Sequence, residues 1–504
     1  MPSYLAPGVY MEEVSSGSKP IEGVGTAVCA FVGFAPRGPL DTPTLVTNWS
    51  QFTQTFGDFT AGSYLAPAVY GYFLNGGGAA YVVRVGAEPD DGKPARAVVP
   101  AIGDEGKHAF TVRALEAGDG LSVEVTEAGE NADDTFKLLV KRGGEVVETF
   151  DNVSLKRGQN NVATAVKQRS KLIAVEETKS SGALVAPRRN ELVPLTAAVQ
   201  AESVRAQDYV GDAADRTGFA GLEAIDEITM LCVPDLMMSH AQGGLDLDGV
   251  KAVQLAMIAH CELMADRVAI LDTPPGLNAQ QVKDWRVNGA GYDSKYAALY
   301  WPWIKVMDPV SGKPVHVPPS GHMAGIWARN DDTRGVHKAP ANEVIRGAIS
   351  LELAITKGEH DQLNPVSVNC LRAFPGQGIR VWGARTLSSD PEWRYLNVRR
   401  LFNFVEKSIL QGTNWVVFEP NDPKLWDSVK RTITMFLRGV WRNGALFGNT
   451  PAESFFVKCD AENNPADSRD QGLLVVEVGI APVKPAEFVV FRISQYADGS
   501  ALEE

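Results

Sequence analysis

The sequence predicts a multidomain protein of the mixed α/β (α+β) class, in which buried strands alternate with amphipathic helices. The first observation behind this prediction is a set of short apolar runs followed closely by Gly or Pro, at 27–34, 81–85, 228–233 and 268–272. The second is a helical periodicity of apolar residues between the last two runs, at 250–264. The third is a change of composition over 91–206, a stretch without Trp, Tyr or Cys.

We interpret residues 91–206 as a mainly β outer domain, a solvent-facing appendage inserted into a loop of the main domain. Short alternating runs in this stretch are separated by Gly-Asp, Gly-Glu and Gly-Gly turns. Two runs, 136–140 and 146–150, flank Gly143-Gly144, which is typical of a β-hairpin. The α/β main domain is therefore expected to be discontinuous, with residues 21–90 and 207–363.

A C-terminal α/β domain is expected over residues 364–483. Strands are predicted at 379–382, 415–418 and 473–481, and an amphipathic helix at 395–409. A second helix is predicted from Pro423 onward, because Asp422 can cap it and proline is favoured at the first helical position.

Extended arms are predicted at both ends of the chain, over 1–20 and 484–504. The C-terminal arm carries an alternating apolar segment that follows two prolines, and the N-terminal arm carries a shorter segment of the same kind. Strands without a place in their own domain can add to a sheet edge of a neighbouring copy. We therefore expect the arms to join copies into a polymer by strand exchange, through Val9, Tyr10, Met11, Glu12 and Glu13 in the first and Phe488, Val489, Val490, Phe491, Arg492 and Ile493 in the second.

Composition argues against several classes of partner. With 48 basic and 61 acidic residues, the net charge is −13, which disfavours binding to nucleic acid. The five cysteines are scattered without a CxxC pair, so neither a disulfide framework nor a zinc site is expected. The longest apolar run, 27–35, is too short to span a bilayer, so no membrane insertion is expected.

No motif in the sequence predicts catalysis, and we expect no catalytic, cofactor-binding or metal-binding residue. The glycines at 76–78 precede a strand, whereas a phosphate-binding loop follows one and opens a helix. Ser320 lies near His322, but without the GxSxG pattern of a nucleophile elbow. Two alternatives remain open: a hydrolase-type enzyme that uses Ser320 and His322, and a non-contractile surface or adhesion protein that binds through 91–206.

Several segments together resemble the tail sheath proteins of contractile phage tails, R-type bacteriocins and extracellular contractile injection systems. They cover both ends and most of the chain outside 91–206, and their order is more specific than any one of them. The matching segments are 7–13, 26–39, 73–77, 81–85, 302–303, 318–322, 324–325, 334–342, 378–386, 394–395, 397–401, 418–421, 425–426 and 485–488.

The resemblance implies a non-enzymatic structural subunit of a helical contractile sheath around an inner tube. Such a sheath drives the tube through a target envelope by switching from a metastable extended packing to a contracted one, without a nucleotide or other cofactor. The implied partners are further copies of the chain, the inner tube protein, and baseplate and tail-terminator or cap proteins. Synthesis and assembly are expected in the cytoplasm, in a phage tail or tail-like particle that can be released.

The resemblance also implies that the C-terminal domain is the inner sheath domain, which faces the tube. The predicted helix 395–409 has a polar strip of mixed charge opposite its apolar face. By this resemblance, the candidates for salt-sensitive contacts with the tube are Arg399, Arg400, Glu406 and Lys407.

Overall fold

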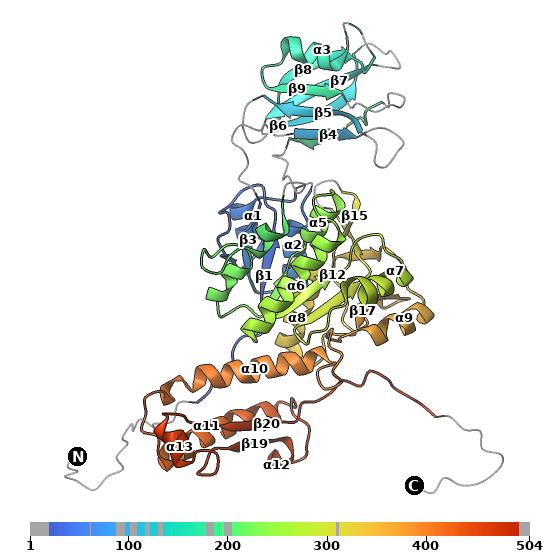
Figure 1. The fold of residues 1–504 in the computed structure, drawn as a ribbon. Helices are drawn as coiled ribbons and strands as arrows, with labels where there is room; N and C mark the ends of the chain where they lie inside the picture. The colour runs from blue at the N-terminus through green and yellow to red at the C-terminus, as the bar shows by residue number, and fades with distance from the viewer. Residues whose placement is uncertain are drawn as a thin grey trace, which may run out of the picture. The chain divides into compact units, whose positions relative to one another are not determined.

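The computed structural model describes residues 20–492, apart from 61, 87–95, 101–107, 116–120, 130–134, 143, 157, 159, 178–185, 191, 196–203 and 309–311. The chain divides into two compact units. The body unit comprises 27–329 and 340–389, and the C-terminal unit comprises 1–26, 330–339 and 390–504. The fold is a mixed α/β arrangement with several sheets, as the sequence predicts (Figure 1).

An eight-stranded sheet with the order β18-β17-β13-β12-β11-β1-β3-β2 forms the centre of the body unit. Neighbours from β17 to β3 are parallel, while β2 and β18 pair antiparallel at the two edges. A parallel sheet is covered on both faces, which explains why its strands are continuous apolar runs in the sequence. The strands are β1 (Val28–Gly33), β2 (Thr44–Val46), β3 (Ala79–Arg84), β11 (Met230–Cys232), β12 (Val268–Asp272), β13 (Ala297–Trp301), β17 (Val368–Phe374) and β18 (Gly378–Val381).

Helices pack against this sheet, and α6 (Leu247–Met264) contacts β12 (Figure 1). The predicted helix over 250–264 is confirmed, with an earlier start because the Asp246 carboxylate accepts a hydrogen bond from the backbone N–H of Gly249. The body unit also contains α1 (Trp49–Phe56), α2 (Leu65–Asn75), α4 (Ala206–Val210), α5 (Leu236–Ala241), α7 (Ala279–Asp284) and α9 (Lys357–Leu363). A small antiparallel sheet has the order β15-β14-β16, with β14 (Ile304–Met307), β15 (Pro314–Val317) and β16 (Ala348–Leu351).

The described residues between 96 and 194 form two antiparallel sheets, with the orders β10-β6-β7-β8 and β4-β5-β9, and one helix. Their apolar side chains form a core of their own, in which the rings of Phe110 and Phe136 stack. The predicted hairpin is present as β7 and β8. The elements are β4 (Arg96–Pro100), β5 (His108–Ala114), β6 (Leu121–Glu127), β7 (Phe136–Arg142), β8 (Glu145–Val153), α3 (Val162–Arg169), β9 (Ile173–Glu177) and β10 (Leu192–Pro194).

The C-terminal unit is built on two long helices, α10 (Leu396–Gly412) and α11 (Pro423–Arg442). As predicted, Pro423 opens α11, and the Asp422 carboxylate accepts a hydrogen bond of 2.8 Å from the backbone N–H of Leu425. Apolar faces of both helices meet in one core. The smaller elements are η5 (Asn414–Val416), α12 (Pro451–Ser454), β19 (Phe455–Lys458), α13 (Ala466–Asp470) and β20 (Glu477–Ile480).

Three expectations about the C-terminal third need correction. The strand predicted at 379–382 is β18, at the edge of the large sheet, so the body unit extends to residue 389 and not to 363. The strand predicted at 415–418 is wrong: a 3-10 helix, η5, and a tight turn occupy this segment. The strand predicted at 473–481 is reduced to β20.

The predicted arms lie largely outside the described residues, which exclude 1–19 and 493–504 and therefore Val9–Glu13 and Ile493. Residues 488–492 are described and form no strand in the single chain. None of the helices in the described ranges is both long and apolar enough to cross a lipid bilayer.

Candidate functional site

The first functional candidate is the polar face of α10, where two adjacent arginines are buried. The Arg399 guanidinium lies 4.5 Å from the centre of the Trp393 ring. Its Nε donates a hydrogen bond of 2.7 Å to Asn403, and its terminal nitrogen lies 3.0 Å from the Glu406 carboxylate. These contacts hold Arg399 against its own helix.

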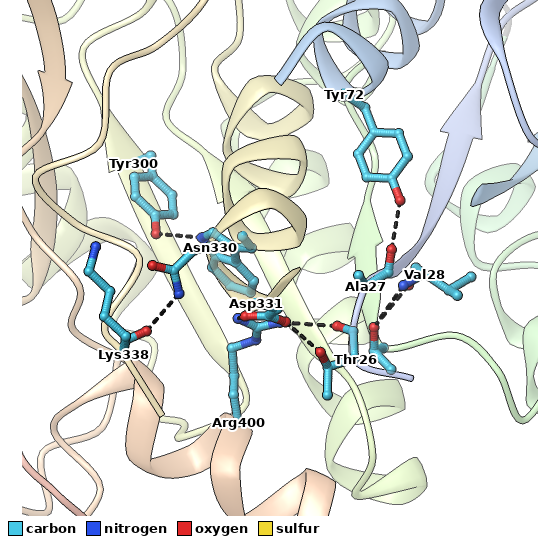
Figure 2. A network of polar contacts seen from close by, with 11 residues as sticks. Thr26, Ala27, Val28, Tyr72, Tyr300, Asn330, Asp331, Lys338 and Arg400 are labelled. Carbon is cyan, nitrogen blue, oxygen red and sulfur yellow. Dashed lines mark hydrogen bonds and ion pairs between the residues drawn. The ribbon is translucent and has the colours of Figure 1, made fainter. Parts of the chain in front are cut away.

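Arg400 is part of a second group of contacts, shown in Figure 2. Its guanidinium donates hydrogen bonds of 2.9 and 2.5 Å to the two oxygens of Asp331, and one of 3.0 Å to the backbone carbonyl of Thr26. Asp331 also accepts a hydrogen bond of 2.6 Å from the Thr26 hydroxyl. Only 4% of either charged side chain is exposed. These three residues, the Arg400 cluster, join α10 to the C-terminal end of α8 (Ser320–Arg334) and to the N-terminal segment.

The segment 20–26 follows α10 away from the Arg400 cluster. The backbone N–H of Val24 donates a hydrogen bond of 3.1 Å to the Ser408 hydroxyl. Gly23 lies so close to the Phe404 ring that a Cβ at this position would be 2.8 Å from it, and Ile21 packs at Gly412. The described N-terminal segment therefore lies along α10, with Ile21 at that helix's C-terminal end.

The four predicted tube-contact residues thus differ in their surroundings. Arg399 and Arg400 are buried and bound within the C-terminal unit. Lys407 is half-buried, and about half of the Glu406 side chain, 53%, is exposed. Of the four, Glu406 has the most surface available to a partner.

A row of cations on α11 was missed by the sequence reasoning. Arg431, Arg438 and Arg442 are exposed and lie on one face with exposed Met435, at spacings of four, three and four residues. None of the three arginines forms an ion pair or hydrogen bond with another described residue. The periodicity of the charges, rather than of the apolar residues, would have identified this face.

The antiparallel pair β19 and β20 is a candidate acceptor for additional strands. In the described part of the chain each strand pairs only with the other, from Phe455 with Ile480 to Lys458 with Glu477. Both outer edges therefore carry backbone groups that a further strand could bond. Two strands alone make a weak sheet, and exposed apolar side chains, among them Phe456 and Val478, extend over this one.

The described end of the C-terminal arm supplies a matching apolar strand. Residues 488–491 are all more than two-thirds exposed, and Phe491 is 84% exposed. From Phe488 to Arg492 no backbone group bonds another described residue. The Tyr395 hydroxyl donates a hydrogen bond of 3.3 Å to Glu487, just before this segment.

Ser320 and His322 are both buried in the body unit and do not form a catalytic pair. The Ser320 hydroxyl donates a hydrogen bond of 2.5 Å to the Asp272 carboxylate, so it is directed away from an imidazole base. The His322 Nδ1 has no hydrogen-bond partner among the described residues, and burial lowers the pKa of its imidazole to about 4. Within the described residues, no three His, Cys, Asp or Glu side chains group closely enough to hold a metal ion.

The fold defines a mixed α/β protein of two units, one built on an eight-stranded sheet and the other on two long helices. Residues 220–387 match the family model of the phage tail sheath protein central domain, and residues 388–495 match that of the phage tail sheath C-terminal domain. The chain belongs to the phage tail sheath family. The boundary between the two matches falls close to the end of the body unit at residue 389.

The tail sheath protein of Burkholderia phage BcepMu is 24% identical over 503 residues, which cover 96% of this chain and 95% of that relative. The tail sheath protein of Vibrio phage KVP40 is 25% identical over 238 residues, 44% of this chain. The chain matches only about a third, 35%, of that longer relative. A similar fold occurs in the sheath complex of an extracellular contractile injection system, PVC, in its contracted state, with a TM-score of 0.60, 22% identity, and coverage of 98% of this chain and 99% of that chain.

Proposed function

We propose that this chain is the structural subunit of a helical contractile sheath that surrounds an inner tube and drives it through a target envelope. One observation carries the proposal beyond family membership: within the described residues, one chain has an exposed apolar segment at 488–491 without backbone partners and a two-stranded sheet whose strands pair only with each other. A strand and an acceptor that are unsatisfied within one copy can satisfy each other between copies. Because donor and acceptor are different surfaces, the contact is head-to-tail and can continue as a helical filament.

In the proposed assembly, the arm of one copy adds to the edge of β19 or β20 in a neighbour. Phe488 and Val490 then face one side of the enlarged sheet, and Val489 and Phe491 face the other. The backbone groups of the arm pair with those of the acceptor strand. The N-terminal arm, with Val9, Tyr10, Met11, Glu12 and Glu13, adds a strand in another neighbour. Arms that keep their partners let rigid bodies rotate from a metastable extended packing to a contracted one.

We also propose that the C-terminal unit makes the tube contacts. Glu406 and Lys407 of α10 are the predicted residues with exposed or half-exposed side chains. In this proposal Arg399 and Arg400 act from inside the unit, by fixing the helix that carries the contacts. The unpaired cations of α11 supply further exposed charge for pairs that weaken with salt and can break on contraction.

The proposed partners are further copies of the chain, the inner tube protein, and baseplate and terminator or cap proteins. The proposed subunit has no enzymatic activity, and the drive comes from the difference in free energy between two packings. Assembly is proposed in the cytoplasm, in a phage tail or tail-like particle.

The arm is tested by comparing Val489→Pro with Val489→Ala in the full-length chain. Proline removes a backbone N–H from the donor strand, whereas alanine keeps it, so only the proline variant is expected to abolish polymerisation. Deletion of 484–504, and separately of 1–14, is expected to give folded protein that does not polymerise. Electron microscopy and sedimentation measure the polymer, and circular dichroism measures the fold. Unimpaired tubes from both deletions would rule out strand exchange.

A further inference from the structure

The turn between α10 and α11 places an aromatic residue where the backbone favours glycine. The backbone N–H of Glu419 bonds the Val416 carbonyl at 3.1 Å and closes a four-residue turn. Val417 has φ −66° and ψ 129°, and Phe418 has φ +69°. This is a type II turn, whose third position requires positive φ and usually holds Gly or Asn. A bulky side chain is strained in that region of conformational space.

The same residue is fully exposed. The relative exposure of Phe418 is 103%, and that of Val417 beside it is 64%. An exposed aromatic ring at the tip of a turn gains nothing for the single chain, because its apolar surface stays in water. Two separate unfavourable features therefore coincide on one side chain, and both would be relieved by Asn or Gly.

Asn421, two residues after the turn, is bonded to two other segments of the C-terminal unit. The Asn421 side-chain amide donates a hydrogen bond of 2.9 Å to the Leu473 carbonyl. The Trp426 indole N–H in turn donates one of 2.7 Å to the Asn421 side-chain oxygen. These bonds order the backbone that follows the turn, so less backbone freedom is lost when a partner binds there.

We propose that Phe418 is an anchor that inserts into an apolar depression on a neighbouring copy of this chain. The Asn421 hydrogen bond places the end of the turn beside Leu473, which begins the segment that leads into β20, an edge strand of the proposed acceptor sheet. Exposed apolar side chains continue from the turn along this segment, at Leu473, Val475 and Val478. The anchor is thus continuous with the surface where a neighbour's arm adds, and the inference rests on the proposed sheath function.

The test compares Phe418→Asn with Phe418→Tyr, and uses Leu263→Asn as a control for the loss of an exposed apolar side chain on a different helix, α6. Asparagine accepts the left-handed conformation, so we expect the melting temperature of the unpolymerised Phe418→Asn chain to rise by about 2 °C. Its critical concentration for polymerisation is expected to rise by about tenfold or more, as for an aromatic hot spot. Phe418→Tyr and Leu263→Asn are expected to polymerise as the wild type does.

The outcomes separate the inference from the proposed function. If the wild-type chain forms no polymer, the proposed function fails. If it polymerises and Phe418→Asn has the same critical concentration, only the anchor is overturned. Normal polymerisation of Phe418→Asn with lost binding to purified tube protein would also overturn it, because the partner would then be the tube. A more stable subunit that assembles less well supports it.

Discussion

At the scale of single residues, His322 shows how a buried polar group links stability to pH. Its imidazole is enclosed in the body unit, where a Cβ on Gly71 would approach the ring to 2.3 Å. Burial lowers its pKa to about 4, whereas an unfolded chain has a value near 6.5. The stabilisation from the neutral ring is therefore complete above about pH 6.5 and is lost as the pH falls through 4.

Replacing His322 with Gln removes this pH dependence. Between pH 7 and pH 5, the wild-type chain is expected to lose about 2 kcal/mol more unfolding free energy than His322→Gln. Burial raises the pKa of Asp235 and Asp272 to about 7, so their contribution to the unfolding free energy increases as the pH falls. Both carboxyls are present in both proteins, so this contribution cancels in the comparison. Denaturant titrations of the body unit's transition at the two pH values give the comparison. His316→Gln, at an exposed histidine, serves as the control; equal pH slopes for His322→Gln and the wild type would contradict the prediction.

Residue types alone did not indicate which polar side chains are internal. Ser320 and His322 lie two positions apart in the sequence, which suggests a catalytic pair, yet the partner of Ser320 is Asp272, 48 positions away. Likewise, Arg399 and Arg400 were placed on a polar strip, although both are buried. Long-range pairing of charges has no local pattern, so the sequence identified the polar face but not its contacts.

At the scale of elements, the Arg400 cluster ties three segments of the C-terminal unit together. A charge removed from water is costly unless its partner remains, so loss of one member leaves the other buried and unpaired. Arg399, on the same helix, is the matched comparison because its acidic partner, Glu406, is half exposed and stays solvated without it. Two adjacent buried arginines thus differ in what their loss leaves behind.

Arg400→Gln is therefore expected to destabilise the C-terminal unit by about 3 kcal/mol or more, and Arg399→Gln by less. The double variant Arg400→Met with Asp331→Leu removes both charges and is expected to recover most of this stability. It still lacks the bonds to Thr26, so amide hydrogen exchange at residues 24–26 is expected to be faster than in the wild type. If the exchange at residues 24–26 is as slow in the double variant as in the wild type, the contacts of Gly23 and Val24 are sufficient to hold the segment without the bonds to Thr26.

Strands that are buried on both faces were predicted well, and segments with exposed apolar side chains were predicted less well. β12 and β13 are buried at every position, and such continuous apolar runs identify parallel strands. The run Trp415–Phe418 is also continuously apolar but forms part of η5 and a turn with an exposed Phe418, shortly before Asp422 and Pro423 start α11. An exposed segment and a buried strand can therefore be equally apolar in sequence.

At the scale of the whole molecule, the residues between 96 and 194 have a core separate from that of the large sheet. The residues that precede and follow this stretch lie close together, since a Cβ at Gly86 would lie 3.7 Å from the Val204 side chain. The change in composition over 91–206 predicts an inserted domain, and the proximity of Gly86 to Val204 explains how the main sheet can form around such a stretch. Since its strands pair only among themselves within the described ranges, the large sheet loses no strand without it.

Replacing residues 87–203 with a linker of two or three glycine and serine residues is therefore expected to leave a folded chain. Because the proposed donor segment and acceptor sheet both lie in the C-terminal unit, the critical concentration for polymerisation of this shortened chain is expected to be close to that of the wild type. Its tubes are expected to have thinner walls, which electron microscopy measures. Adding Val489→Pro to the shortened chain should abolish the tubes, which excludes polymerisation by a new route. A shortened chain that is folded by circular dichroism but stays monomeric would instead place essential contacts between copies in the inserted stretch.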